Sequence, residues 1–375
     1  MNGVTRGLFA IVVGVVALSP ILSFAQPSSP GAVFVMTNAA DSNQVIAFER
    51  AADGALTHRA TYDTQGRGSG GITDPLQSQG SLTLSQDHSL LFVANAGSGT
   101  VSVFSVNQSH LTFLSKVPSG GSEPAAVAEH QGLVYVLNKG GAGSVTGFRL
   151  DFGGKLTQIK DSTAFLSGTY TGGGAIAFSP DGHYLLVPEV HSNNIDVFPV
   201  MANGKLGPIV VNASPGPGAF ALAFASDGKV MVSETGPADG TNASGISSYS
   251  ILANGGLSAV SQSVPTLGAG NCWNVVTPNG KWVYASNSAS SDISGFAIGQ
   301  GGTLTPIRDT VVGTNPAESI NLDLAVSANG KYLYSLNSGT GKIGIFAIQS
   351  DGSLVSLGEA GDFPASTGFN GIAAL

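Results

Sequence analysis

The stretch GGAIAFSPDGHYLLVPEVHSNNIDVFPVMANGKL, residues 173–206, carries the pattern that decides the fold. It contains three short apolar runs, at Gly174 to Phe178, Tyr184 to Pro188 and Ile195 to Val200. Polar segments and turns of the Asx-Gly type separate these runs, and a fourth run begins after the last turn. Short runs rich in Val, Ile, Phe and Tyr between such turns are typical of antiparallel strands. One unit therefore predicts a four-stranded meander.

The same unit repeats along the chain every 40–50 residues or so, which is the spacing of a β-propeller. The second run of each unit ends in Asn or Glu, at Asn38, Asn95, Asn138, Glu189, Glu234, Asn287 and Asn337. No segment past residue 25 shows a sustained helical period. We therefore predict an all-β fold, a seven-bladed β-propeller of four-stranded antiparallel blades.

The first unit lacks its first run, because the chain's first strand, Val33 to Met36, already resembles a second run. The missing run appears at the other end of the chain. Residues 371–375, GIAAL, resemble the run GAIAF at 174–178. We predict that the C-terminal strand joins the N-terminal blade and closes the ring, which leaves only short blade edges exposed.

Composition excludes several classes of protein. The net charge is -8 at pH 7 and no basic stripe is present, so we expect no nucleic-acid partner. Hydrophobic residues make up 42% of the chain and recur in strand-sized packets, which excludes disorder. The single cysteine, Cys272, cannot form an internal disulfide and is predicted to pack as a small apolar residue. We expect a monomer that binds a small molecule or glycan and needs no cofactor.

The first 25 residues differ from the rest of the chain. Arg6 precedes an apolar run from Leu8 to Leu18, Pro20 breaks the run, and Ser23-Phe24-Ala25 offers small residues at the cleavage positions. The run is too short to span a bilayer, which takes about 20 residues. We therefore expect export to the periplasm or the exterior, with no membrane span left after cleavage. The expected divisions are a signal peptide at 1–25, a loose segment at 26–31 and the propeller at 32–375.

The two faces of the predicted ring differ in their connections. Tight turns such as SPDG and SANG join runs one and two, and similar turns join runs three and four on the same face. They supply the positive φ of hairpins, so we interpret that face as structural. The opposite face carries long, irregular loops, where binding and catalytic groups concentrate. We expect the site on this loop face, near the mouth of the central channel.

Glu189 and Glu234 replace the usual Asn in adjacent units. Two nearby carboxylates at the mouth could hold a divalent cation, or raise one pKa for acid–base chemistry. The alternative is that both cap the strand end as the Asn does. His191 lies two residues beyond Glu189 and is a further candidate base. The candidate catalytic residues are Glu234, Glu189 and His191.

Substrate-binding candidates lie where strands reach the loop face. They are Asn271, Trp273, Asn287, Glu318, Asn321 and Asn337. Trp273 begins the inner strand of the sixth unit, where it either packs in the core or offers a platform for a sugar ring. The sequence contains no zinc-type His/Cys cluster, no nucleophile elbow and no phosphate-binding P-loop.

The units LSQDHSLLFVAN (84–95), AIAFSPDGHYLLVPE (175–189) and VSANGKYLYSLN (326–337) resemble the seven-bladed lactonase propellers. That family includes bacterial 6-phosphogluconolactonase and the fungal carboxymuconate cyclases, also called cycloisomerase 2. The resemblance covers residues 31–375, and it implies the propeller fold and an activity on lactones.

The family places a His before one inner strand and a GPRH-like stretch before the next, whose blade has a strand ending in Asn-Glu. Here these stretches read TGGG (171–174) and GPGAF (216–220), so the resemblance implies that the His and Arg are missing while Glu234 remains. Loop-face acids outnumber Arg67 and Lys139, which disfavours an anionic substrate. Two hypotheses stay open. One is hydrolysis of a neutral, sugar-derived lactone, and the other is a non-catalytic envelope propeller that binds a glycan, a cation or a protein.

Overall fold

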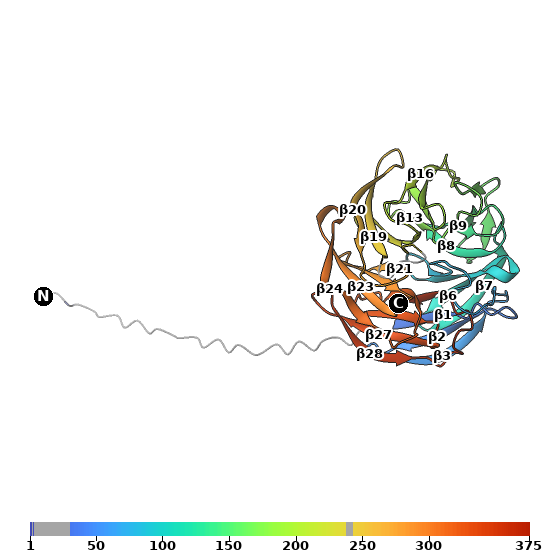
Figure 1. Ribbon diagram of the computed structural model, residues 1–375. Helices are drawn as coiled ribbons and strands as arrows, with labels where there is room; N and C mark the ends of the chain where they lie inside the picture. The colour runs from blue at the N-terminus through green and yellow to red at the C-terminus, as the bar shows by residue number, and fades with distance from the viewer. Residues whose placement is uncertain (2, 4–30, 238–242) are drawn as a thin grey trace.

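The computed structural model describes Met1, Gly3 and residues 31–237 and 243–375. The predicted signal peptide and nearly all of the segment that follows it lie outside this part of the chain. The described residues form seven antiparallel sheets that follow one another around a ring (Figure 1), which confirms the predicted seven-bladed all-β propeller. Among the described residues, no helix is both long and apolar enough to cross a membrane.

For each blade, the strands are given in their order from the ring axis outward. Blade one contains β29 (Ile372–Ala374), β1 (Gly31–Met36), β2 (Gln44–Arg50) and β3 (Leu56–Asp63). Blade two contains β4 (Leu82–Leu84), β5 (Leu90–Asn95), β6 (Thr100–Asn107) and β7 (His110–Pro118). Blade three contains β8 (Pro124–His130), β9 (Leu133–Asn138), β10 (Ser144–Leu150), β11 (Leu156–Gln158) and β12 (Ala164–Phe165), which also pairs with β10. Blade four contains β13 (Ala177–Phe178), β14 (Tyr184–Glu189), β15 (Asn194–Pro199) and β16 (Val210–Ala213).

The remaining three blades have the same order. Blade five contains β17 (Ala219–Phe224), β18 (Val230–Glu234), β19 (Gly245–Ile251) and β20 (Leu257–Pro265). Blade six contains β21 (Asn271–Val276), β22 (Trp282–Asn287), β23 (Asp292–Ile298) and β24 (Leu304–Thr314). Blade seven contains β25 (Asn321–Val326), β26 (Tyr332–Asn337), β27 (Lys342–Ile348) and β28 (Leu354–Ala360). Short 3₁₀ turns lie at Ala96–Ser98 and Gln300–Gly302.

The second strand of each blade is buried on both faces, because neighbouring blades pack against it from either side. Strands β1 and β9 are buried along their whole length, whereas the outer strand β28 is largely exposed. This explains why the second runs are continuous apolar segments and do not alternate. The hydrophobic cores lie between blades, as where Phe92 of blade two packs with Val127 of blade three.

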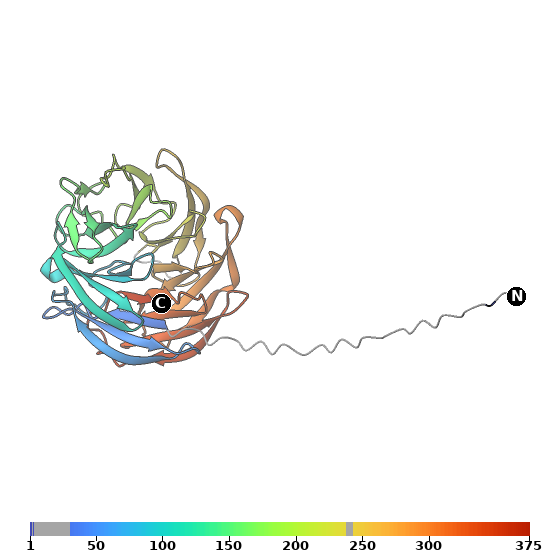
Figure 2. The ribbon, with the colours of Figure 1, turned by 180° about the vertical axis from the view of Figure 1, so that it is seen from behind.

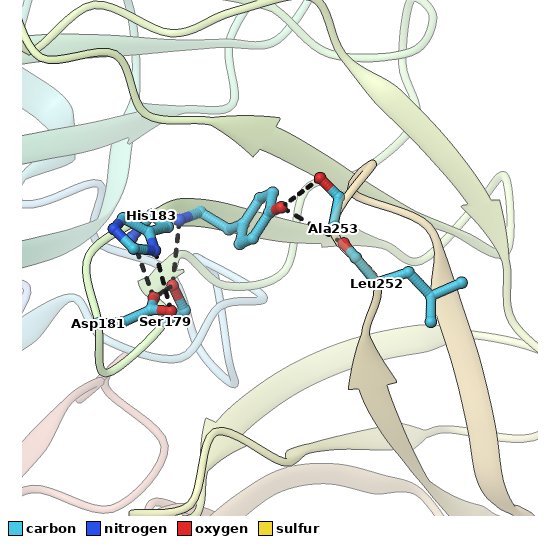
Figure 3. Close-up of polar contacts among 6 residues, drawn as sticks. Ser179, Asp181, His183, Leu252 and Ala253 are labelled. Atoms are coloured by element: carbon cyan, nitrogen blue, oxygen red, sulfur yellow. Dashed lines mark hydrogen bonds and ion pairs between the residues drawn. The ribbon is translucent and has the colours of Figure 1, made fainter.

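On the face of tight turns, local hydrogen bonds between side chains and backbone hold the turns. In blade four, the side chain of Asp181 accepts hydrogen bonds from Ser179 Oγ at 2.5 Å and from the backbone N–H of His183 at 3.0 Å (Figure 3). Tyr184 Oη donates to the Ala253 carbonyl at 2.9 Å and so connects blade four to blade five. A groove of about 480 Å³ lies between these two blades, and Ser179, Asp181 and Tyr184 are among the residues that line it.

The ring closes through its two ends, and this prediction is confirmed. Strand β29 pairs antiparallel with β1, with Val33 opposite Ala374 and Val35 opposite Ile372. The Leu375 N–H donates to the Ala32 carbonyl at 2.8 Å and extends the ladder by one bond. In Figures 1 and 2 the first and last blades accordingly lie side by side, and the C-terminus lies inside the ring.

The connection between blades one and two reaches across the ring axis, and there its residue Gln79 contacts three other blades. The Gln79 backbone N–H donates to Gly174 O at 2.8 Å, and its side-chain amide donates to Leu222 O at 3.3 Å. Its side-chain oxygen accepts from the Asn274 N–H at 3.1 Å. The inner strand of a blade has one unpaired edge facing the axis, so Gln79 satisfies backbone groups of three blades at once.

Its neighbour Ser78 extends the same hub. The Ser78 hydroxyl donates to Ala125 O at 2.8 Å, and Trp273 Nε1 donates to Ser78 O at 3.1 Å. Trp273 also packs edge-on against Phe220, with ring centroids 5.1 Å apart. We call residues 74–79 the axial segment. It joins the inner strands of blades three, five and six and the loop before β13 of blade four.

Deleting residues 368–375 is expected to destabilise the protein strongly. The deletion removes β29 and withdraws the buried side chains of Phe369 and Ile372, each of which contributes about 1.5–3 kcal/mol by burial. It also exposes the edge of β1. Thermal unfolding followed by circular dichroism should show a large fall in Tm, and Ile372→Ala alone should give a smaller one. A truncated protein with the wild-type melting curve contradicts the closure.

Candidate functional site

A cleft of about 360 Å³ opens on the loop face between the axial segment and blades two to four. Its walls combine apolar groups with a few polar ones. The residues that bear on its chemistry are Leu76, Gln77, Glu123, Lys139, Tyr170 and His191. Concave sites with few converging polar groups are the usual form of small-molecule sites.

His191 is held in one orientation. Its Nδ1 lies 2.9 Å from the Tyr170 carbonyl oxygen, and its backbone N–H donates to Thr171 O at 2.9 Å. A carbonyl oxygen can only accept, so Nδ1 carries the proton and Nε2 of the neutral ring keeps a free lone pair. Gly172 makes this possible, because a Cβ there would lie 2.9 Å from the imidazole. The glycine at 172 thus makes room for an imidazole from a neighbouring loop.

Lys139 supplies positive charge to the cleft. Its ammonium donates to the carbonyl oxygens of Leu76 and Gln77, both at 2.8 Å, which leaves one of its three N–H donors available. Burial lowers the Lys139 pKa to about 8, and the nearby carboxylates of Asp74 and Glu123 oppose that shift. The lysine therefore both fixes the axial segment and points a titratable cation at the cleft.

Glu234 has no part in lining this cleft. Its side chain is fully buried, and one oxygen accepts hydrogen bonds from Ser214 Oγ at 3.0 Å, the Gly216 N–H at 3.1 Å and Ser247 Oγ at 2.6 Å. A Cβ at Gly216 would collide with the carboxylate. The expectation that this carboxylate opens onto the mouth is therefore corrected, because loop hydroxyls and a close glycine enclose it within the wall of blade five.

Glu189 is likewise buried and lies in the wall of blade four. It accepts from Ser167 N–H at 3.1 Å and from the hydroxyls of Ser167 and Ser192, each at 2.5 Å. Against the raising effect of burial, these hydrogen bonds lower the Glu189 pKa. Burial, and then the hydrogen bond and charge of Glu189, raise the pKa of Asp196 to about 8. The two carboxyl groups thus favour a state that holds one proton, with Glu189 ionised.

The two glutamates do not converge, since their hydrogen-bond partners belong to different blades. Glu234 does what Asn95 does in blade two, where the side chain binds Ser102 of the third strand at 2.8 Å, because Glu234 accepts from Ser247 of its own third strand. Glu189 instead accepts from Ser167 and Ser192, which lie in loops. Within residues 31–237 and 243–375, no group of three or more His, Cys, Asp or Glu side chains is placed to hold a metal ion. A catalytic role for either glutamate, or a cation at them, stays a prediction.

The predicted substrate-binding residues are dispersed and do not line the cleft. Trp273 belongs to the hub and is buried, and Glu318 is exposed beside a separate groove at blade seven. The four asparagines are fully buried, as in Asn321, whose amide donates to Ser286 Oγ at 2.6 Å: Asn271, Asn287, Asn321 and Asn337. A binding role for these six residues stays a prediction.

Sequence reasoning missed Tyr170, the carbonyls of Leu76 and Gln77, and the pairing of Lys139 with Glu123. The backbone N–H of Lys139 donates to Glu123 O at 3.0 Å, so two loops of blade three are held together there. Lys139 directly follows the strand-ending Asn138, which is a signal that places it on the loop face. Nothing in the sequence shows that the axial segment comes to it.

The structure is thus a β-propeller with a cleft on its loop face. The family described as "Lactonase, 7-bladed beta-propeller" matches residues 33–165 and 123–366, and the chain belongs to that family. A comparison with curated proteins found no significant match.

Solved structures share the architecture. A candidate 6-phosphogluconolactonase from Bacteroides fragilis is 19% identical, with a TM-score of 0.70 over 93% of this chain and 98% of that one. The periplasmic gluconolactonase of Pseudomonas aeruginosa is 19% identical, with a TM-score of 0.66 over 91% and 99%. A Lactobacillus plantarum protein is 17% identical, with a TM-score of 0.72 over 92% of this chain and 99% of that one. At these identities the likeness establishes the fold alone.

Stability is expected to fall as the pH rises from 5 to 8.5. Burial raises the pKa of Asp74 to about 7, of Asp196 to about 8 and of Asp323 to about 7, against an ordinary 3.8. The folded protein therefore holds protons that the unfolded chain has lost, and this stabilisation disappears as the pH passes these values. Calorimetry should show Tm falling, on the order of 5 °C.

The matched variant for this effect is Asp196→Asn, whose amide can donate to Glu189 as the protonated carboxyl does. Its Tm should depend less on pH than that of the wild type. A Tm that is constant or rises between pH 5 and 8.5 contradicts the assigned proton binding.

Proposed function

We propose that the protein is an exported hydrolase of a neutral, sugar-derived lactone, with His191 as the general base in the loop-face cleft. The observation that carries this proposal is the Nδ1–Tyr170 contact, which frees Nε2 for a proton. Export is supported by the signal-peptide pattern of residues 1–25. Membership of the lactonase family supports the reaction class.

In this mechanism His191 Nε2 takes a proton from water as the oxygen attacks the lactone carbonyl carbon. The third N–H of Lys139 donates to the carbonyl oxygen, where negative charge develops. The ring C–O bond then breaks, and the leaving alkoxide takes the proton back from the imidazolium. The product is the open hydroxy acid, and no redox partner or metal enters the balance.

A non-catalytic binding role is the second candidate, and one observation favours it. Glu234, the acid that the family resemblance retains, is fully buried and engaged with serine hydroxyls. A protein that binds a glycan, a cation or another protein through the same face would need no base. The two proposals differ in whether turnover of any lactone depends on His191.

Replacing His191 with Gln should lower kcat for neutral aldonolactones by 10²–10⁴-fold or so, because Gln keeps a hydrogen bond but accepts no proton. Acid release at constant pH measures this. His183→Gln, on the tight-turn face, is the control and should leave kcat unchanged. If His191→Gln is silent while Glu234→Gln abolishes turnover, the base is Glu234. If the wild type hydrolyses no lactone, the proposed hydrolysis is contradicted and the binding role is the candidate that remains.

The dependence of kcat/KM on pH should reveal the ionisation of Lys139. Its pKa of about 8 means that the ammonium loses its proton near pH 8, instead of near 10.5 as in free lysine. We expect kcat/KM to fall as the pH rises through that value, after subtraction of spontaneous hydrolysis. In Lys139→Arg the charge persists, so the decline near pH 8 should disappear. A wild-type profile that is flat to pH 10 excludes the charged lysine from the mechanism.

A further inference from the structure

Glu123 is the acidic side chain among the residues that line the cleft. It lies on an exposed loop at the edge of blade three, in a left-handed conformation with φ of 53°. Its backbone oxygen accepts the Lys139 N–H, so the two residues are fixed as neighbours at the backbone. Their side-chain charges also interact, because Glu123 favours the charged form of Lys139.

The positive charge of Lys139 is already compensated. Its ammonium binds two carbonyl oxygens, and the carboxylates of Asp74 and Glu123 lie close to it. Asp74 is held behind the cleft, where its oxygen accepts from Gln77 N–H at 3.0 Å and from Asn370 Nδ2 at 2.9 Å. Glu123 and Lys139 thus bring opposite charges to the cleft lining, and the lysine leaves no surplus of positive charge for an anionic ligand.

We infer that Glu123 determines the charge specificity of this cleft, so that it admits neutral ring substrates and excludes phosphorylated or carboxylated ones. The inference rests on the proposed function and deepens it. A second anion brought beside Lys139 would meet the Glu123 carboxylate at the cleft edge. Like charges a few ångströms apart in a partly solvated site repel strongly enough to change affinity by an order of magnitude.

Charge accounts for this selection without any change of shape. The lactone ring of a neutral substrate and that of its phosphate monoester are the same size, so the shape of the ring alone does not separate them. Discrimination of this kind comes from a repulsive group built against the wrong ligand. It should therefore weaken with added salt, because the group is exposed to solvent.

The test compares Glu123→Gln with the wild type on a neutral aldono-δ-lactone and on the same ring carrying a phosphate monoester. The wild type should prefer the neutral lactone in kcat/KM. Glu123→Gln should lower the ratio of kcat/KM for the neutral lactone to that for the phosphate monoester about tenfold. Adding 0.5 M salt should lower the same ratio in the wild type. Asp41→Asn is the matched control, since Asp41 is also an exposed acid on the loop face, between β1 and β2, and does not line the cleft. It should keep the wild-type preference.

Binding provides a second readout that needs no turnover. Calorimetric titration with the hydrolysis-resistant aldono-δ-lactam and its phosphate monoester should show the same tenfold change in relative affinity. If the neutral lactone is hydrolysed but Glu123→Gln keeps the wild-type preference, the charge assignment is overturned and the proposed function stands. If the wild type binds the neutral lactam and hydrolyses nothing, the proposed reaction falls, while the titration still decides the role of Glu123. If it binds neither lactam and hydrolyses nothing, both are overturned.

Discussion

The pairing of β29 with β1 is the interaction on which this structure depends. Six blades form from consecutive segments of chain, but the blade at the junction takes its innermost strand from the last residues of the sequence. Without that strand, β1 would present an open edge to the ring axis and the buried faces of two blades would lose their cover. Closure therefore joins the ends of a long chain through a few hydrogen bonds, and it also fixes the position of the mouth.

A second constraint arises at the axis. Every inner strand leaves backbone groups unpaired on its axial edge, and a ring of seven such strands cannot pair them with one another. The axial segment meets part of this need through Gln79 and Ser78, which bind backbone groups in blades three, four, five and six. The same segment presents the carbonyls of Leu76 and Gln77 to Lys139. A device that stabilises the ring thus also forms one wall of the cleft.

In the cleft, two loops of blade four fit closely together. The space left by Gly172 is taken by the imidazole of His191 from a neighbouring loop. Glu189 and Glu234 stand where other blades have asparagine, and both carboxylates are enclosed by serine hydroxyls. The polar groups left available in the cleft are instead Nε2 of His191 and the third N–H of Lys139, and carbonyl oxygens of the backbone hold both side chains.

The sequence by itself determined the strands, the seven-fold repeat and the closure by the tail, because these depend on local periodicity and turn chemistry that recur in each unit. It also placed His191 and Lys139 on the loop face, since strand direction alternates within a meander. Which of the loop-face groups meet was decided only by the tertiary structure. Burial of Glu234 depends on a glycine and hydroxyls from other strands, and the cleft depends on an axial segment that crosses to blades far away in sequence. Such contacts arise from packing between distant segments, and no periodicity within a unit encodes them.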